Sequence, residues 1–350
     1  MKTPAFALAA RAALAALALT LPACAPVEDL PSDPDRAESA VASGTDGAPA
    51  PSCEPLSPRT VPLELAVQPE AGATPFVEVA SRATTTLRVM VYQMGFGPVL
   101  DVIETKAREG VSVRVVLDVA QKSVNEKYKV RLEAAGAQVV WSDPRFTFTH
   151  AKVIIADESE AVLSTGNYYI KNIERERNFA VRDADPGDVD VLVRLFDADF
   201  AKTTPDLSCT RLLVAPENAK ERLLAFIRSA KSEILVHSMQ LGERDVRDAL
   251  AERRRAGVAV RALLADPSWI DANLDAAAFL SANGIEARHR PHVHVKAITV
   301  DGQAAYVGSI NLSWTSLTKN REVGLLVTER ANLDAVRSTF EADWTVAKPF

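Results

Sequence analysis

The sequence predicts an α/β protein of two duplicated α/β/α-type halves with mainly parallel sheets, packed about a pseudo-twofold axis. The first observation is a repeat: residues around His150 recur around His294, 144 positions later, and the same spacing relates Asn167 to Asn311 without gaps. The second is that each copy alternates short apolar runs with helical patterns, as layered α/β proteins do. The third is an apolar content of 47% in 350 residues, which is enough for two cores.

The chain begins with a predicted export signal. Lys2 and Arg11 precede an apolar run at 12–21, which is too short to span a bilayer and is typical of a secretory signal peptide. We therefore expect residues 1–23 to be a signal peptide and the protein to be exported.

The sequence Leu21-Pro-Ala-Cys24 resembles the lipobox of bacterial lipoproteins, in which the cysteine is lipidated. The alternative is cleavage after Ala23 with a free thiol. Residues 24–52 are rich in Pro, Ser, Gly and Ala and are expected to be a disordered tether. The protein is thus expected to be lipid-anchored to the cell envelope, with the outer membrane favoured, or secreted.

The first half is expected at 53–207 and the second at 208–350. In the first half the apolar pattern predicts strands at 87–92, 111–117 and 138–141, helices at 98–109 and 130–135, and a strand pair at 149–156 and 161–164. The second half repeats Gly110-Val-Ser-Val-Arg114 as Gly257-Val-Ala-Val-Arg261.

Cys53 and Cys209 each follow a serine at the start of a half. In an oxidising compartment, with Cys24 lipidated, they are the remaining even pair. We predict a disulfide between them, and the alternative is two buried thiols.

Each half carries the same set of polar residues. The first has His150-Ala-Lys152, Asp157, Ser164-Thr165 and Asn167, and the second has His294-Val-Lys296, Asp301, Gly308-Ser309 and Asn311. Because side chains alternate along a strand, each His and its Lys should lie on one face.

This set suits a phosphodiester. Ammonium groups offset its negative charge, which makes Lys152 and Lys296 candidate catalytic residues. Hydroxyl and amide groups bind its oxygens, so the candidate phosphate-binding residues are Thr165, Asn167, Ser309 and Asn311. A neutral imidazole can attack phosphorus and an imidazolium can protonate the leaving group, which makes His150 and His294 the candidate catalytic pair. Asp157 and Asp301 belong to the same candidate catalytic set, although we favour them as structural caps at strand ends.

The pattern HxKxxxxD, followed after six residues by GSxN and present twice, resembles the signature of the phospholipase D superfamily over most of residues 53–350. The first copy departs from it by Ser164 and Thr165, which keep a small residue and a hydroxyl. The resemblance implies the phospholipase D fold, one shared site at the interface, a phosphohistidine intermediate, and no cofactor or metal.

The resemblance also assigns a group that orients each histidine of the opposite half. These groups are Asn178 and Glu322, each 28 residues after a motif histidine. A carboxylate stabilises a positive imidazole and an amide does not, which favours His150, backed by Glu322, as nucleophile and His294, backed by Asn178, as acid and base.

The expected substrate is a phospholipid at a membrane surface, whose headgroup phosphodiester is hydrolysed or transferred. A metal-independent endonuclease and a cardiolipin-synthase-like phosphatidyl transferase are the alternatives; a net charge of -6 disfavours bulk binding of nucleic acid. A monomer is expected because both motifs are in one chain.

Several basic residues flank the motifs and are expected to ring an anion site: Lys171, Arg175, Arg177, Arg288, Arg290, Lys319 and Arg321. His292-Val-His294 has metal-site spacing but lacks further ligands, so no metal is expected.

Overall fold

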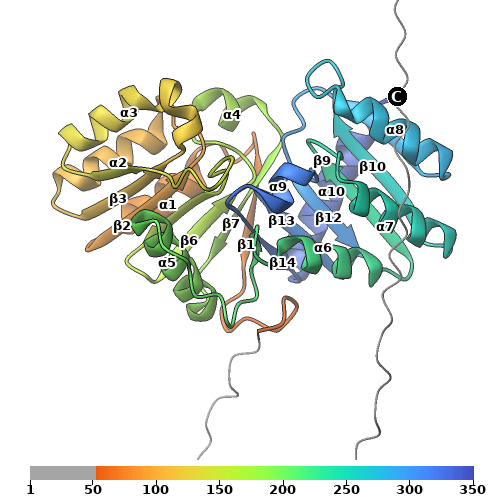
Figure 1. The fold of residues 1–350 in the computed structure, drawn as a ribbon, viewed down its shortest axis with the longest axis horizontal. Coiled ribbons are helices and arrows are strands. Elements are labelled where there is room, and N and C mark those ends of the chain that lie inside the picture. The colour runs from red at the N-terminus through yellow and green to blue at the C-terminus, as the bar shows by residue number, and fades with distance from the viewer. Residues whose placement is uncertain (1–52) are drawn as a thin grey trace, which may run out of the picture. The chain divides into compact units, whose positions relative to one another are not determined.

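The computed structural model describes residues 53–350, which form two α/β halves (Figure 1). The predicted signal peptide, the tether and Cys24 lie outside the described residues. Within residues 53–350, no helix has the length and the apolar character needed to cross a membrane.

The first half contains a seven-stranded sheet in the order β1-β7-β6-β5-β2-β3-β4. Its strands are β1 (Glu64–Gln68), β2 (Thr86–Val91), β3 (Ser112–Leu117), β4 (Gln138–Trp141), β5 (Lys152–Ala156), β6 (Glu160–Ser164) and β7 (Asn178–Asp183). Its helices are α1 (Thr74–Arg82), α2 (Pro98–Arg108), the short 3₁₀ helix η1 (Val119–Gln121), α3 (Lys122–Ala134), α4 (Ile170–Arg175) and α5 (Pro186–Ala201).

The second half contains an eight-stranded sheet in the order β15-β11-β10-β9-β12-β13-β14-β8. Its strands are β8 (Leu213–Ala215), β9 (Glu233–Ser238), β10 (Ala259–Ala265), β11 (Glu286–Arg290), β12 (Lys296–Val300), β13 (Ala304–Gly308), β14 (Glu322–Val327) and β15 (Lys348–Pro349). Its helices are α6 (Ala219–Arg228), α7 (Arg244–Arg255), α8 (Ala272–Ala282), α9 (Trp314–Thr318) and α10 (Arg330–Val346).

The two halves have the same topology, so the predicted duplicated α/β architecture is confirmed. Reading each sheet from its matching edge, β1-β7-β6-β5-β2-β3-β4 corresponds to β8-β14-β13-β12-β9-β10-β11, and β15 is an added edge strand. Contacts between the halves are reciprocal as well: Thr149 bridges to Arg321, and Arg177 bridges to Val293, which are the same two positions exchanged.

The sheets are mixed rather than mainly parallel, which corrects one detail of the prediction. In the first half β2, β3 and β4 pair in parallel, whereas β1, β7, β6, β5 and β2 pair antiparallel in that order. A tight turn at 157–159 joins β5 to β6, and a turn of this length permits only antiparallel neighbours. The parallel arrangement is restricted to the strands that helical crossovers connect.

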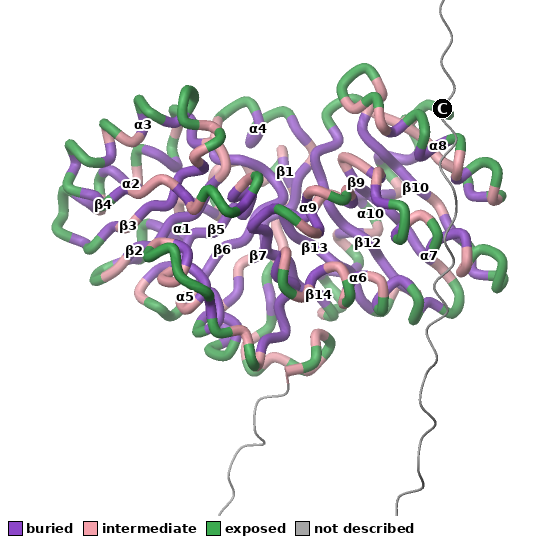
Figure 2. Tube along the Cα trace, viewed as in Figure 1, coloured by how far each residue is buried: buried purple, intermediate pink, exposed green. Residues whose placement is uncertain are grey.

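Apolar packing divides each half into layers. Helices α1–α3 and α6–α8 each build a core with one face of their own sheet. A third cluster lies between the sheets and combines residues of α5 and α10 with strand residues of both halves, such as Leu163, Val181, Val307 and Val323. The central strands are buried along most of their length, and the exposed segments lie mainly on helices and loops (Figure 2). The halves therefore meet through an apolar layer, which favours one fixed arrangement of the site.

Two predicted elements have different limits in the structure. Helix α3 begins at Lys122, well before the predicted residue 130. The sequence analysis missed its first turns because they are mostly exposed and polar and carry no apolar periodicity. Strand β5 begins at Lys152 rather than at 149, because residues 149–151 instead bond to Arg321 of the other half.

A disulfide joins Cys53 to Cys209 and so links the beginnings of the two halves.

Candidate active site

The two histidine motifs lie where the halves meet, immediately before β5 and β12. The backbone amide of His150 donates to the carbonyl oxygen of Arg321 at 2.8 Å, and that of His294 donates to the carbonyl oxygen of Arg177 at 3.1 Å. Each histidine is thus bonded to the residue of the other half that directly precedes its orienting residue, Glu322 or Asn178. The side chains of both histidines and both motif lysines are buried.

Each imidazole is oriented by a residue of the opposite half. His150 Nδ1 lies 2.9 Å from Glu322 Oε2, and His294 Nδ1 lies 2.9 Å from Asn178 Oδ1. Both partner oxygens accept a hydrogen bond, so each ring carries its proton on Nδ1 and leaves Nε2 available. The Glu322 carboxylate is fixed in turn by Ser316 and Asn320.

The two histidines differ in their electrostatic surroundings. Burial lowers the pKa of His150 to about 4, while the Glu322 carboxylate acts in the opposite direction. Burial and the charge of Lys296, with contributions from Lys152 and His150, lower the pKa of His294 well below its ordinary value. His150 is therefore the imidazole whose Nδ1 lies at hydrogen-bonding distance from a carboxylate, whereas the Glu176 carboxylate lies 3.8 Å from Nδ1 of His294.

The motif lysines are buried cations without a carboxylate in hydrogen-bonding contact among the described residues. Lys296 Nζ donates to the carbonyl oxygens of Thr165 at 3.0 Å and His294 at 2.5 Å, and Lys152 Nζ donates to the carbonyl oxygen of His150. Burial lowers the pKa of Lys296 to about 7 and that of Lys152 well below its ordinary value. Buried ammonium groups of this kind are stabilised when an anion binds beside them.

The candidate phosphate-binding residues divide into two kinds. Thr165 Oγ1 donates to Asn178 Oδ1 at 2.8 Å, and Ser309 Oγ donates to the carbonyl oxygen of Val323 at 3.2 Å. Both hydroxyl groups therefore bond to residues that surround the histidines. Asn167 and Asn311 are different, because the buried Oδ1 atom of each has no hydrogen-bond partner in residues 53–350. Since a primary amide also offers two donors, these equivalent side chains can serve a bound phosphate.

The motif aspartates have structural partners. Asp157 accepts hydrogen bonds from the backbone amides of Thr84, Thr85 and Thr86, and Asp301 accepts from those of Lys231, Ser232 and Glu233. Although partial burial acts to raise it, these bonds lower the pKa of Asp301 to about 2. The structure places both aspartates at hairpin turns, where they cap the start of a neighbouring strand and do not contact the histidines.

The sequence analysis missed three residues of the site. The Tyr92 ring lies 4.7 Å from the His150 ring, and Trp269 stacks on His294 at 5.9 Å between centroids. Burial raises the pKa of Asp118 to about 6, and Lys152 is close enough to oppose this shift. Asp118 directly follows the predicted strand 111–117, and a polar residue after a parallel strand is a signal that could have identified it. Trp269 has no such signal.

Two further histidines and one of the flanking arginines lie outside the histidine site. His289 Nδ1 lies 3.0 Å from Asp266 Oδ2, and His237 is buried beside Phe179 and Phe340. Arg321 is fully buried and pairs with Asp199, so it does not ring the site as expected. No group of three His, Cys, Asp or Glu side chains within residues 53–350 is arranged to hold a metal ion.

A hollow of about 400 Å³ is lined by Trp269 and Glu176, among others, both of which lie next to His294. Tyr169 and Lys171 line this hollow and also a second one of about 350 Å³. The second has an apolar rim, in which Phe96 is 52% exposed and Ile170 is 46% exposed. The site thus combines a buried cationic centre with an exposed apolar margin.

The comparisons with known proteins agree with this arrangement. A family model described as "Cardiolipin synthase, PLD-like domain" matches residues 76–202 and 223–344. The chain is 24% identical over 278 residues to the minor cardiolipin synthase ClsB of Bacillus subtilis (strain 168), a match that covers 69% of this chain and 70% of that protein. It is 35% identical over 78 residues to mouse 5'-3' exonuclease PLD4, which covers 20% of this chain and 16% of that protein.

Solved structures share the fold. Phosphatidylserine synthase of Haemophilus influenzae superposes with a TM-score of 0.63 at 13% identity, over 82% of this chain and 87% of that one. Polyphosphate kinase of Porphyromonas gingivalis also gives 0.63, at 19% identity, over 81% of this chain and 50% of that one. With paired histidine motifs, a duplicated fold and a family match across both halves, the chain belongs to the phospholipase D superfamily, whose members act on phosphodiester bonds.

Proposed function

We propose that the chain cleaves or transfers the headgroup phosphodiester of phospholipids through a covalent phosphohistidine. The observation that carries the proposal is the shared centre: two imidazoles with free Nε2 atoms and two buried ammonium groups, held together by contacts that cross between the halves. A diester anion placed there meets a nucleophile, an acid and compensating charge.

In the first step His150 Nε2 attacks phosphorus, and the bond from phosphorus to the headgroup oxygen breaks. That oxygen takes the proton from Nε2 of a protonated His294. Glu322 stabilises the positive charge on the phosphorylated imidazole. His294 holds its proton once the substrate is bound, because the phosphate anion offsets the lysine charges that lower its pKa.

In the second step neutral His294 accepts a proton from water or an alcohol. The oxygen of that molecule attacks phosphorus, the bond from phosphorus to nitrogen breaks, and His150 returns to its neutral state. Water gives hydrolysis and an alcohol gives transfer, so one site supports both outcomes.

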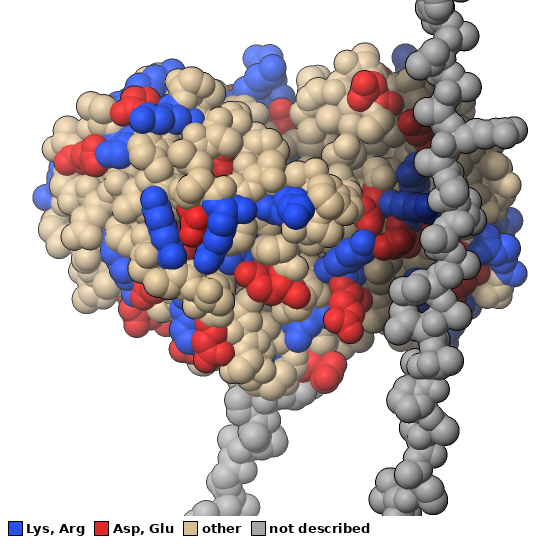
Figure 3. Space-filling view, viewed as in Figure 1, with Lys and Arg blue, Asp and Glu red and all other residues tan. Residues whose placement is uncertain are grey.

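The exposed apolar margin favours a lipid substrate. Phe96 and Ile170 lie at the rim of the hollow, Trp269 covers His294, and Trp314 is 55% exposed at the position equivalent to Ile170. Large exposed apolar side chains beside an anion site suit a membrane surface, where acyl chains adjoin phosphates. On the face in Figure 3 acidic side chains lie among the basic ones, and several basic side chains gather across the middle of the face.

The phospholipid substrate at a membrane surface, the lipid anchor at Cys24 and the monomeric state are further parts of this proposal. An anchored enzyme would meet its substrate without leaving the membrane plane. The phosphatidyl-transferase alternative is supported by the name of ClsB, and the nuclease alternative by the short match to an exonuclease. The margin of Phe96 and Ile170 makes lipid our first choice.

The experiment that tests the proposal uses the full-length chain with phosphatidylcholine vesicles and ethanol, with and without EDTA. We expect choline release and phosphatidylethanol formation in both conditions, and neither with His150→Ala. Digestion of single-stranded DNA without lipid turnover would replace the lipid substrate by nucleic acid. Turnover of neither substrate would overturn the proposed phosphodiesterase activity.

A further inference from the structure

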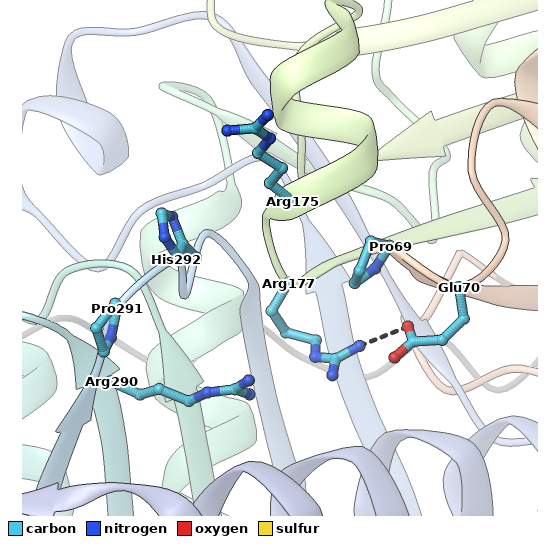
Figure 4. Close-up of a pocket in the computed structure, with 7 residues that line it drawn as sticks. All are labelled: Pro69, Glu70, Arg175, Arg177, Arg290, Pro291 and His292. Carbon is cyan, nitrogen blue, oxygen red and sulfur yellow. Dashed lines mark hydrogen bonds and ion pairs between the residues drawn. The ribbon is translucent and has the colours of Figure 1, made fainter.

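A pocket lined by three arginines adjoins the active site. Its volume is about 360 Å³, within the range of about 300–1,000 Å³ typical of small-molecule sites. Its lining residues are Pro69, Glu70, Arg175, Arg177, Arg290, Pro291 and His292. In Figure 4 the side chain of Arg290 extends toward Arg177, the side chain of Arg177 extends toward Glu70, and Arg175 lies at the end of α4.

Three arginines meet two carboxylates at this pocket. Arg177 pairs with Asp343 at 2.9 Å, and Arg290 contacts the same carboxylate. Arg175 forms no ion pair with any residue of the described chain. Glu70 is the acidic residue in the lining. It binds Arg177 at 2.6 Å, and its side chain is 62% exposed.

The exposed Glu70 carboxylate occupies the place of an incoming anion. Because it reaches Arg177 from the solvent side, a stronger anion can displace it without disturbing the core. Phosphate is such an anion, since guanidinium groups bind its oxygens in pairs of parallel hydrogen bonds.

Backbone hydrogen bonds and shared lining residues connect this pocket to the histidine site. The amide of Arg177 donates to the carbonyl oxygen of His292 at 2.8 Å, and the carbonyl oxygen of Arg177 accepts from the amide of His294. Pro291 and His292 also line the neighbouring hollow that contains Trp269, which stacks on His294. A ligand in the arginine pocket therefore lies beside whatever occupies the histidine site.

We propose that the arginine pocket binds a second phosphate group, carried as a phosphomonoester on the lipid headgroup, while the scissile diester lies between the histidines. This inference rests on the proposed function and narrows its substrate class to lipids with phosphorylated headgroups. Glu70 leaves Arg177 when the phosphomonoester enters, and Arg175 supplies a further cation.

The test compares kcat/KM for phosphatidylinositol 4-phosphate and phosphatidylinositol in mixed micelles, using the full-length protein. We expect the wild type to prefer the phosphorylated lipid. Arg175→Gln should lower that preference about tenfold, the usual effect of losing a hydrogen bond between charged groups, with a larger loss for the phosphorylated lipid than for phosphatidylinositol. Glu70→Gln should raise the preference.

The matched control is Arg244→Gln, because Arg244 is highly exposed on α7 and should not alter the preference. Turnover of both lipids with an equal preference in all variants would overturn the arginine-pocket proposal and leave the proposed function standing. Inhibition by inorganic phosphate that depends on Arg175, without any lipid preference, would overturn the headgroup assignment in favour of a free anion. Failure of the wild type to turn over either lipid would overturn the proposed function and this inference with it.

Discussion

The Nδ1 atom of His294 lies 2.9 Å from Oδ1 of Asn178, a residue 116 positions earlier in the chain and in the other half. The equivalent contact of His150 is to the carboxylate of Glu322. The duplicated site is therefore symmetric in geometry but differs in the group bonded to each Nδ1: a carboxylate for His150 and an amide for His294, whose nearby carboxylate, Glu176, lies 3.8 Å away. This difference gives the two imidazoles different chemical tasks and leads to the first predictions.

The roles of the two histidines can be separated by trapping the intermediate. After incubation with phospholipid and an acid quench, His294→Ala should still carry phosphohistidine on His150. The intermediate forms more slowly because the acid of the first step is missing, and it persists because the base of the second step is missing as well. His150→Ala should accumulate none, and both should lose at least about 10³-fold in kcat/KM. The measurement is mass spectrometry of peptides under conditions that preserve the phosphoramidate bond. The reverse labelling pattern would exchange the roles, and His289→Ala is the control.

Replacing Glu322 by Gln tests the carboxylate behind His150. The substitution keeps an acceptor for Nδ1 but removes the charge that stabilises a positive imidazole, so we expect kcat to fall about 10²–10⁴-fold with little change in thermal stability. Asn178→Asp places a carboxylate behind His294 and should raise the pKa of that imidazole, which is visible by NMR titration of the ring. Equal activity of Glu322→Gln and the wild type would show that the charge has no catalytic role.

The pH dependence of kcat/KM should have a basic limb near pH 7. Burial lowers the pKa of Lys296 to about 7, so raising the pH through this value removes a positive charge that offsets the phosphate. On the acid side, activity should fall below about pH 4, where His150 becomes protonated on Nε2. Lys296→Arg should move the basic limb upward, because a guanidinium remains charged. The control is Lys220→Arg, on α6. If the basic limb stays at the same pH in Lys296→Arg, the titrating group is not Lys296.

Asp301 should contribute to stability rather than to catalysis. Its folded pKa of about 2 lies below the ordinary 3.8, so its contribution is present above pH 3.8 and is lost as the pH falls through 2. We expect Asp301→Ala to lower the free energy of unfolding by about 1–2 kcal/mol, because backbone amides lose their acceptor. Denaturant titration and kcat/KM at 25 °C provide the two readouts. A loss of activity above about 100-fold with unchanged stability would place Asp301 in the chemistry.

The local sequence determined a large part of this protein. The 144-residue repeat predicts two equivalent halves, and the short apolar runs place β2, β3, β4 and β6 close to their observed limits. The spacing of His150, Lys152 and Asn167, repeated in the second half, identifies the residues of the site. These features could be read because strand periodicity and motif spacing are local properties of the chain.

The tertiary structure alone decided which strands are antiparallel, that residues 149–151 bond across the interface, and that Tyr92 and Trp269 flank the imidazoles. It also decided the depth of burial that lowers the pKa values of the motif lysines, and the meeting of Arg177 with Arg290 around one carboxylate. These relationships depend on how two sheets pack through an apolar layer, and packing between residues far apart in the chain leaves no periodic trace in the sequence.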